Sequence, residues 1–251
     1  MSPVNTYEVP KDGTAMSVRL ADIDDPRELV SLSSRILAAA GHGDLIWGHS
    51  SVRDADDRGV WIKSAEWGME EVTPDRVHLV NADGLVVEGD GPRHSEYPIH
   101  TEMMAARSDV NAVVHTHAPY AVALAATGQR LRPVSHAANM FVPPDVPAFA
   151  RTADLITTPE LGKMLAEDLG DARAVFMVNH GIVAVGRTLQ SATVAAILLE
   201  RACEQQILTH SAGGWPSWSD DVEALSKRRN IHNERALDAV WRYLVRGLSL
   251  Q

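Results

Sequence analysis

The stretch Val113–Ala118, VVHTHA, places two histidines one residue apart at the end of an apolar run. Such a run predicts a buried β-strand, in which alternate side chains point to the same face of the sheet. His115 and His117 would then lie on one face, about 6–7 Å apart along the chain, where both rings can converge on one ion. A buried histidine is more often a hydrogen-bonded core residue than a ligand, and two of them would each need a buried partner. The stretch alone leaves core packing and metal binding open.

The segments on either side of this strand predict one α/β domain. Asp25 and Pro26 are typical of a helix start, and the Asp83-Gly84 pair between apolar runs is typical of a hairpin turn. We assign residues 1–24 to an extended N-terminal arm and residues 25–251 to the domain. Strands are expected within 60–64, 76–89, 111–118 and 172–186, and helices within 24–41, 95–107, 188–208 and 222–248.

The composition excludes several classes of function. With 251 residues, of which 45% are hydrophobic and 22% charged, the chain can bury a sizeable core. A net charge of −10 argues against a nucleic-acid partner. Because no run approaches the roughly 20 apolar residues of a membrane span, and no signal-type segment is found, we expect a cytoplasmic protein without a membrane partner. The single cysteine, Cys203, excludes an internal disulfide and a cysteine-rich zinc module.

Two further residues extend the histidine pair. His180 lies in Asn-His-Gly after a Val-rich strand, a tight turn that would expose its ring at a sheet edge. Three neutral histidines with open coordination positions are typical of a catalytic metal site. Glu96 precedes the helix expected before the histidine strand, and a carboxylate beside a divalent ion can act as ligand, acid or base.

This pattern resembles the class II aldolase and adducin-head family over roughly residues 28–210. The resemblance implies a single α/β domain with a central, mainly antiparallel β-sheet flanked by helices. It also implies a homo-oligomer, usually a tetramer, with active sites between neighbouring subunits. The matching pieces are GDLIWGHSSVRD (43–54), SEYPIHTEMMAARSDVNAVVHTHAPYAVALAATG (95–128) and VNHGIVAVG (178–186).

The resemblance also assigns roles to the singled-out residues. His115, His117 and His180 match the family's metal-binding histidines, and Glu96 matches its catalytic acid/base. In that chemistry a divalent ion acts as a Lewis acid that stabilises the enolate formed as a carbon–carbon bond breaks. Three imidazoles and a carboxylate suit zinc, and manganese, iron or cobalt also accept such a set.

The chain departs from the family where the sugar-phosphate enzymes bind phosphate. His49 replaces the asparagine of a Gly-Asn-x-Ser loop, and His94-Ser95 replaces a Ser-Ser pair. Small residues that open backbone N–H groups suit phosphate, whereas arginine and histidine suit a planar carboxylate. We therefore expect a small anionic substrate, although Arg93 could equally be a solvated surface charge. The expected substrate contacts are His49, Ser50, Arg93, His94 and Ser95.

A second departure concerns a tyrosine that many of these aldolases receive from a neighbouring subunit. Ser135-His136-Ala137 aligns with that position, so His136 is a candidate replacement as proton donor or substrate contact.

These departures favour one branch of the family. The preferred hypothesis is a metal-dependent carbon–carbon lyase that decarboxylates a hydroxylated aromatic or pyridine dicarboxylate, such as dihydroxyphthalate, through a metal-stabilised enolate or phenolate. The first alternative is a metal-dependent class II aldolase acting on a non-phosphorylated hydroxy-keto substrate. The second is a catalytically inactive, adducin-like binding module. Metal content separates the last from the other two, and release of carbon dioxide or of an aldehyde separates the first two.

Overall fold

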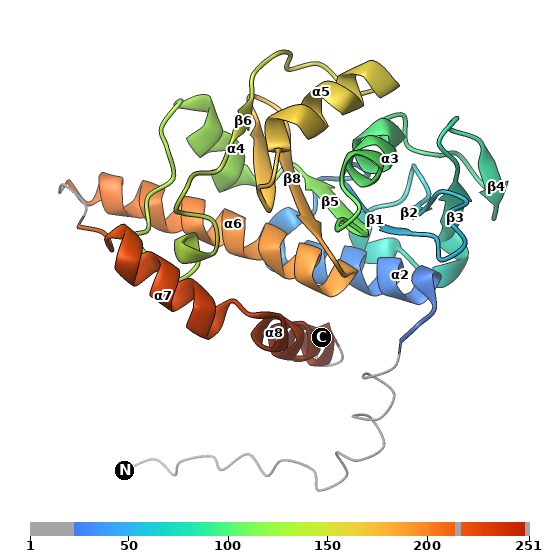
Figure 1. The fold of residues 1–251 in the computed structure, drawn as a ribbon. Coiled ribbons are helices and arrows are strands. Elements are labelled where there is room, and N and C mark those ends of the chain that lie inside the picture. Colours follow the sequence, from blue (N-terminus) through green and yellow to red (C-terminus); the bar gives the residue numbers. More distant parts are fainter. Residues whose placement is uncertain (1–22, 214–216, 249–251) are drawn as a thin grey trace, which may run out of the picture.

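The apolar runs pair into one eight-stranded sheet in the part of the chain that the structure, a computed structural model, describes: residues 23–213 and 217–248 (Figure 1). The strand order is β4-β3-β2-β1-β5-β8-β7-β6, and every neighbouring pair is antiparallel except β6 and β7. This confirms the mainly antiparallel sheet. The strands are β1 (His49–Arg53), β2 (Val60–Lys63), β3 (Val77–Val80), β4 (Val86–Glu88), β5 (Ala112–Thr116), β6 (Ala148–Phe149), β7 (Ala174–Met177) and β8 (Gly181–Gly186).

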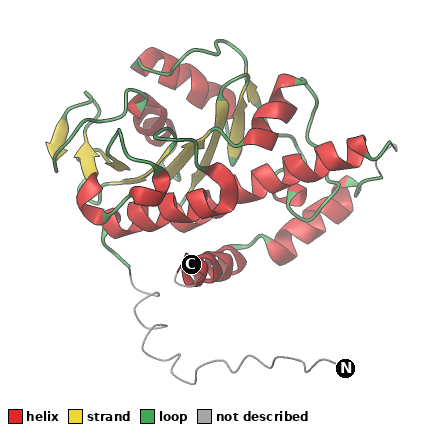
Figure 2. Cartoon of the chain, turned by 180° about the vertical axis from the view of Figure 1, so that it is seen from behind, coloured by secondary structure: helices red, strands yellow, loops and turns green. Residues whose placement is uncertain are grey.

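Helices cover both faces of this sheet (Figures 1 and 2). Helices α3 and α5 pack on one face, and α2, α4 and α6 pack on the other, with α8 against α2 and α6. No helix in the described ranges has the length and apolar character needed to cross a membrane. The helices are α2 (Pro26–Leu37), α3 (Tyr97–Ala106), α4 (Pro119–Ala126), α5 (Pro159–Leu169), α6 (Leu189–Ser211), α7 (Asp221–Ile231) and α8 (Glu234–Leu248).

Alternation along the central strands divides the apolar residues between two cores. On β5, Val113 belongs to the core beneath α3 and α5, whereas Val114 belongs to the core beneath α6. On β8, Val183 and Ala184 divide in the same way. Since both faces are covered, the strands read as continuous apolar runs, and a polar side chain on either face is removed from water.

Helix ends follow the capping signals of the sequence. The Asp25 carboxylate accepts a hydrogen bond from the Arg27 N–H at the start of α2, and the Thr188 hydroxyl accepts one from the Ser191 N–H at the start of α6. Of the predicted arm, 1–24, only the last two residues belong to the described ranges, so the rest of that prediction lies outside them.

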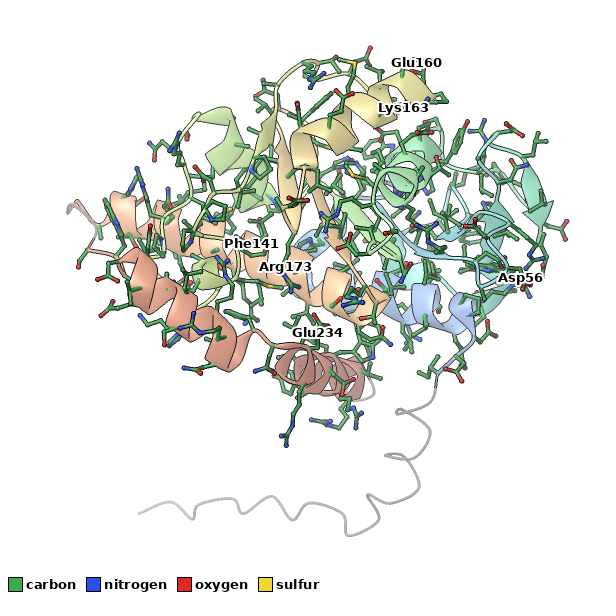
Figure 3. The ribbon with its side chains drawn as sticks, viewed as in Figure 1. Asp56, Phe141, Glu160, Lys163, Arg173 and Glu234 are labelled. Carbon is green, nitrogen blue, oxygen red and sulfur yellow. The ribbon has the colours of Figure 1, made fainter. Side chains whose placement is uncertain are left out.

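The closing helical segment consists of two helices. Asn233 lies between α7 and α8, and its side-chain oxygen accepts from the N–H of Ala236 in the first turn of α8. Arg173 and Glu234, labelled in Figure 3, form a 3.6 Å ion pair that joins the start of α8 to the segment before β7.

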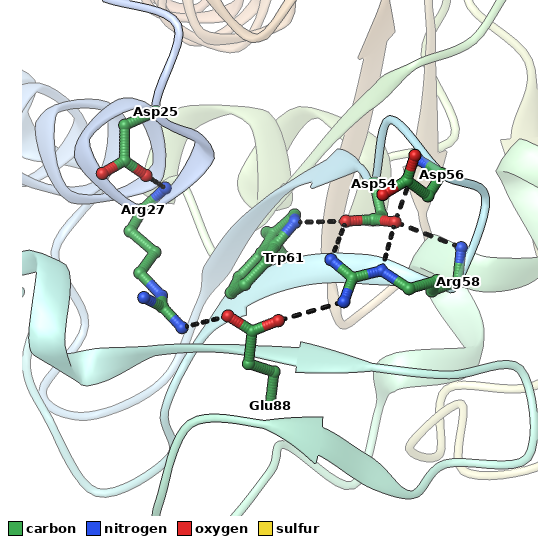
Figure 4. Close-up of polar contacts among 7 residues, drawn as sticks. All are labelled: Asp25, Arg27, Asp54, Asp56, Arg58, Trp61 and Glu88. Atoms are coloured by element: carbon green, nitrogen blue, oxygen red, sulfur yellow. Dashed lines mark hydrogen bonds and ion pairs between the residues drawn. The ribbon is translucent and has the colours of Figure 1, made fainter.

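A buried carboxylate joins the β1–β2 turn to the strands beside it (Figure 4). Both oxygens of Asp54 accept hydrogen bonds from Arg58, and one also accepts from the Trp61 indole at 2.9 Å. Arg58 continues to Glu88 on β4, and Glu88 accepts from Arg27 on α2. We call these residues (Asp54, Arg58, Trp61, Glu88 and Arg27) the Asp54 cluster.

Candidate metal centre

Two candidate ligands lie where β5 ends, near the middle of the sheet. His115 is on the same face of β5 as Val113, which packs beneath α3 and α5, and His117 follows the last strand residue. The ring centroids of His115 and His117 are 5.0 Å apart. The predicted shared face is therefore present.

The third histidine is brought to this place by the turn between β7 and β8. Asn179 adopts a left-handed backbone conformation, with φ of 58°, which asparagine tolerates better than most residues. A Cβ added at Gly181 would lie 2.6 Å from the carbonyl oxygen of Thr116, so only glycine lets the turn approach β5 this closely. The His180 ring consequently lies with its centroid 5.1 Å from that of His115.

These three histidines and Glu96 form one group. One possible ligand atom from each residue can be chosen so that all four atoms lie within 4.8 Å of one another. A hydrogen bond or a salt bridge joins only two groups, so neither explains why four such groups meet beneath α3. One divalent ion would bind all four of them.

The hydrogen bonds around the rings leave the correct atoms free for an ion. His115 donates from Nδ1 to the carbonyl of Ile182 at 3.0 Å, and His117 donates from Nδ1 to Asp44 at 2.8 Å. Each neutral ring then carries its lone pair on Nε2. The Nε2 atoms of His115, His117 and His180 are buried and have no hydrogen-bond partner in the described ranges. The group therefore fits a metal ion.

Glu96 lies just before α3, with its carboxylate over the histidines. Its Oε1 accepts from the Ile156 N–H at 2.8 Å and lies 3.6 Å from Nε2 of His180, while Oε2 lies 3.7 Å from Nε2 of His115. Burial raises the pKa of Glu96, but the nearby rings of His180 and His115 and the hydrogen bond from the Ile156 N–H outweigh burial and lower it to about 2. Glu96 is thus an ionised carboxylate that can bind a cation or accept a proton.

Two of the predicted substrate contacts border this group. His49 on β1 is the register partner of His115 on β5, and the His94 ring lies 4.3 Å from the His49 ring between centroids. Burial lowers the pKa of His94 to about 2 and, with the charges of nearby groups, lowers that of His49 well below its usual value. Both rings are neutral at pH 7 and offer hydrogen-bond donors or acceptors without charge.

His100, which the sequence patterns did not single out, is fully buried next to His49. Its Nε2 lies 2.6 Å from Nδ1 of His49, and its Nδ1 lies 2.6 Å from the Ser51 hydroxyl oxygen. The signal was present, because residues 96 and 100 are one helical turn apart and face the same side.

The remaining predicted contacts are placed differently. Ser50 is the register partner of Val114, and its hydroxyl points to Ser34 of α2, so its side chain lies on the face away from the candidate site. Its predicted role as a substrate contact is therefore not supported, because adjacent residues of a strand point to opposite faces. Ser95 is exposed between buried His94 and Glu96, and its role stays a prediction.

Arg93 and Arg53 have internal partners. The Arg93 guanidinium donates to the carbonyls of Gly84 and His94 and stacks 4.5 Å above the Tyr97 ring. It is neither a solvated surface charge nor a fully free clamp. Arg53 donates to the carbonyls of Met104 and Val110 and to a side chain beside them. It therefore holds the segment that leads into β5.

His136 lies apart from the four-residue group. Its ring is exposed, its carbonyl accepts from His232 at 2.7 Å, and it lines a separate cavity of about 640 Å³ with Arg201 and Trp218. Within one chain it does not join the candidate metal centre.

The fold and the site together define an α/β protein with three histidines and a glutamate, a group that could hold a metal ion, at the centre of a mainly antiparallel sheet. The family model for the class II aldolase and adducin N-terminal domain matches residues 27–207. This chain belongs to that family.

Individual relatives include both decarboxylases and aldolases. The 3,4-dihydroxyphthalate decarboxylase of Rhodococcus jostii is 32% identical over 213 residues, which are 80% of this chain and 87% of that protein. The 5-deoxy-D-ribulose 1-phosphate aldolase of Bacillus thuringiensis is 32% identical over 72% of this chain and 84% of that protein. Among solved structures, an aldolase II superfamily protein from Pseudomonas syringae has a TM-score of 0.80 and 26% identity, covering 92% of this chain and 96% of that chain.

Proposed function

We propose that this protein is a metal-dependent carbon–carbon lyase that decarboxylates a hydroxylated aromatic or pyridine dicarboxylate. The proposal rests on one observation: a set of possible metal ligands lies directly beside two buried, neutral histidines. Glu96 and three histidines with free Nε2 atoms would form a cation site, and neutral His49 and His94 border it at positions where the family resemblance implies asparagine and serine in the sugar-phosphate enzymes. The dihydroxyphthalate decarboxylase relative supports the choice of substrate class.

The residues have separate tasks in this reaction. His115, His117 and His180, with Glu96, would hold the divalent ion; zinc suits the set, and manganese, iron or cobalt also fit. Such an ion supplies Lewis-acid charge that stabilises negative charge developing on the substrate. His49 and His94 offer hydrogen bonds to the carboxylate that is not lost. Arg93 is left with a supporting role, since it holds the carbonyl of His94.

Glu96 is the candidate proton carrier. Decarboxylation breaks the bond between the ring carbon and the carboxylate carbon, leaves the electron pair in the ring system, and requires one proton at the ring carbon. As an ionised carboxylate, Glu96 can accept the proton of the neighbouring hydroxyl group and return it to that carbon. Carbon dioxide leaves, and the hydroxyl group regains a proton from solvent.

An aldolase is the second candidate, favoured by the 5-deoxy-D-ribulose 1-phosphate aldolase relative. The same cation site and proton carrier would then serve cleavage of a hydroxy-keto substrate. We propose a non-phosphorylated one, because the buried His49 and His94 occupy positions where phosphate would need small residues and open N–H groups. An adducin-like module without catalysis is the third reading, and it needs no metal.

Assembly is part of the proposal. Because His136 is exposed and apart from Glu96, it would act only on the site of a neighbouring copy, as in a homotetramer. Light scattering gives the mass in solution, and His136→Ala tests the residue. A monomer with full activity would exclude this role for His136.

The test combines metal analysis with two product assays. Purified protein is analysed for metal and incubated with 3,4-dihydroxyphthalate or a hydroxypyridine dicarboxylate. About one ion per chain and release of carbon dioxide support the decarboxylase. The same metal content with an aldehyde released from hydroxy-keto substrates, and no carbon dioxide, would favour the aldolase. A protein that binds no divalent metal would leave the binding module.

A further inference from the structure

Three buried side chains form a line of hydrogen bonds that ends at the candidate site. Ser51 and His49 lie on the same face of β1, and His100 lies over them from the first turn of α3. The Ser51 oxygen is 2.6 Å from Nδ1 of His100, and Nε2 of His100 is 2.6 Å from Nδ1 of His49. All three residues are at most 1% exposed, so water is excluded from the line.

The direction of the protons along this line follows from the serine. A buried hydroxyl hydrogen needs an acceptor, and His100 Nδ1 is the only side-chain or backbone partner of the Ser51 hydroxyl within the described ranges. If Ser51 donates to Nδ1, the neutral His100 ring carries its hydrogen on Nε2 and donates to Nδ1 of His49. His49 then carries its own hydrogen on Nε2. In the reverse direction the Ser51 hydrogen would be buried without an acceptor.

We propose that Ser51 and His100 are positioning residues that hold His49 as the Nε2–H tautomer, so that His49 donates a hydrogen bond to the substrate carboxylate and does not bind the metal. The ring of His49 lies with its centroid 5.0 Å from that of His115, as near as His117 does. A protonated Nε2 would keep His49 from binding an ion despite this proximity, because a nitrogen that carries a hydrogen has no lone pair for an ion.

The same tautomer gives His49 its use in the site. An N–H group beside a cation site accepts no cation, and it selects an anionic or carbonyl oxygen of the substrate. The asparagine that the family resemblance implies at this position could present an amide N–H without outside help, whereas a histidine must have its tautomer set by a neighbour. The identity of the acceptor as a carboxylate rests on the proposed function; the tautomer itself does not.

Nuclear magnetic resonance reads the tautomer directly. The full-length protein is labelled with ¹⁵N-histidine and loaded with zinc, which is diamagnetic, and long-range ¹H–¹⁵N spectra are recorded. Signals of His49 are assigned by their loss in His49→Gln. We expect the Nε2–H pattern for His49. An Nδ1–H pattern, or a doubly protonated ring at pH 7.5, would overturn the proposal in the native protein before any positioning variant is made.

Two pairs of variants test which residues set the tautomer of His49. Ser51→Ala should move His49 to a mixture of tautomers, whereas Ser50→Ala, the adjacent serine that faces α2, should leave the spectrum unchanged. His100→Leu should have the same effect as Ser51→Ala, and His100→Gln should restore the native pattern because its amide can donate in place of Nε2–H. Identical His49 signals in Ser51→Ala and Ser50→Ala would refute the positioning role.

The kinetic arm tests the substrate contact. With 3,4-dihydroxyphthalate, Ser51→Ala should raise KM about 10-fold, the effect of losing a hydrogen bond to a charged group, while kcat changes less and metal content stays constant. An unchanged KM together with a changed tautomer would reject the carboxylate contact. Absence of carbon dioxide release from the native protein would reject the proposed function, and the spectra would still decide the tautomer.

Discussion

Two polar clusters of this molecule are built in opposite ways. In the Asp54 cluster each carboxylate oxygen has partners: Asp54 accepts from Arg58 and Trp61, and Glu88 accepts from Arg58 and Arg27 (Figure 4). The candidate metal centre instead keeps buried ring nitrogens on His115, His117 and His180 that have no hydrogen-bond partner among the described residues, and so does His94 at its border. Such atoms are expensive to bury unless something binds them. The polar atoms of the Asp54 cluster are thus satisfied by one another, whereas the open nitrogens of the candidate metal centre are free to bind a ligand.

The largest effect is expected for His115→Ala. Loss of a central ligand should reduce the metal content from about one ion per chain to near zero and activity at least about 10³-fold, because several kcal/mol of charge stabilisation are removed. Elemental analysis and carbon dioxide release measure both. The exposed His210→Ala is the matched control and should change neither. If the variant kept its metal and turned over normally, the proposed difference between the two clusters would be wrong, because the histidines would then be core residues.

Glu96→Gln should separate binding from turnover. The amide retains the shape of the side chain and an oxygen for the Ile156 N–H but cannot carry a proton, so turnover should fall about 10²–10⁴-fold with the metal retained. The control is Glu102→Gln, a half-buried glutamate farther along α3. If Glu96→Gln reacted at the native rate, another group would have to move the proton.

A third, smaller effect is expected at Asp44, whose hydrogen bond supports His117 of the candidate metal centre. Its carboxylate accepts from Nδ1 of His117 and thereby orients Nε2. Asp44→Ala should weaken metal affinity about 10–100-fold, and Asp44→Asn, which keeps an acceptor oxygen, should weaken it less. Competition with a chelator gives both dissociation constants. Equal affinities for Asp44→Ala and the native protein would show that His117 needs no support.

The smallest effect is expected in the Asp54 cluster, on stability alone. Asp54→Asn should lower the free energy of unfolding by about 1–3 kcal/mol, as expected for hydrogen bonds to a charged group, and leave metal content and turnover unchanged. Asp56→Asn, whose side chain is exposed, is the control. Metal loss in Asp54→Asn would show that the two clusters are coupled.

The pH dependence of the free energy of unfolding gives a second test of the Asp54→Asn prediction. Arg58 holds the pKa of Asp54 well below its usual range. Because the folded-state pKa lies below the unfolded value of about 4, the carboxylate stabilises the fold above that value and loses its contribution as the pH falls below it. The difference between native protein and Asp54→Asn should therefore shrink between pH 7 and pH 3 in urea unfolding. A difference that is constant over this range would contradict the assignment.

Local patterns in the sequence predicted most of the fold. Asp25 does cap a helix, Asp83-Gly84 does lie between paired strands, and Asn-His-Gly does form the turn that carries His180. These features depend on a few adjacent residues, so the sequence shows them directly. The approach of Glu96 to His115 is different, because it needs α3 to pack on the sheet, and only the family resemblance predicted it.

The residues that could not be predicted from local patterns depend on contacts between secondary-structure elements. His100 gains its importance from Ser51 and His49 on another element, and Asp44 from His117. Ser50 is the opposite case. Alternation along β1 already places it on the other face from His49, so its assignment as a substrate contact could have been avoided from the sequence.

The strand order also separates two properties that enzymes often combine. β5 and the β7–β8 turn carry the three histidines, whereas β1 carries His49 and lies on the other side of β5 from β8. Exchanging residues 48–54 with those of a relative would then alter which molecules are accepted and leave cation affinity intact, provided that Asp44 stays in place. A change confined to β1 would therefore reach the substrate side of the candidate site while the elements that carry the three histidines stay as they are.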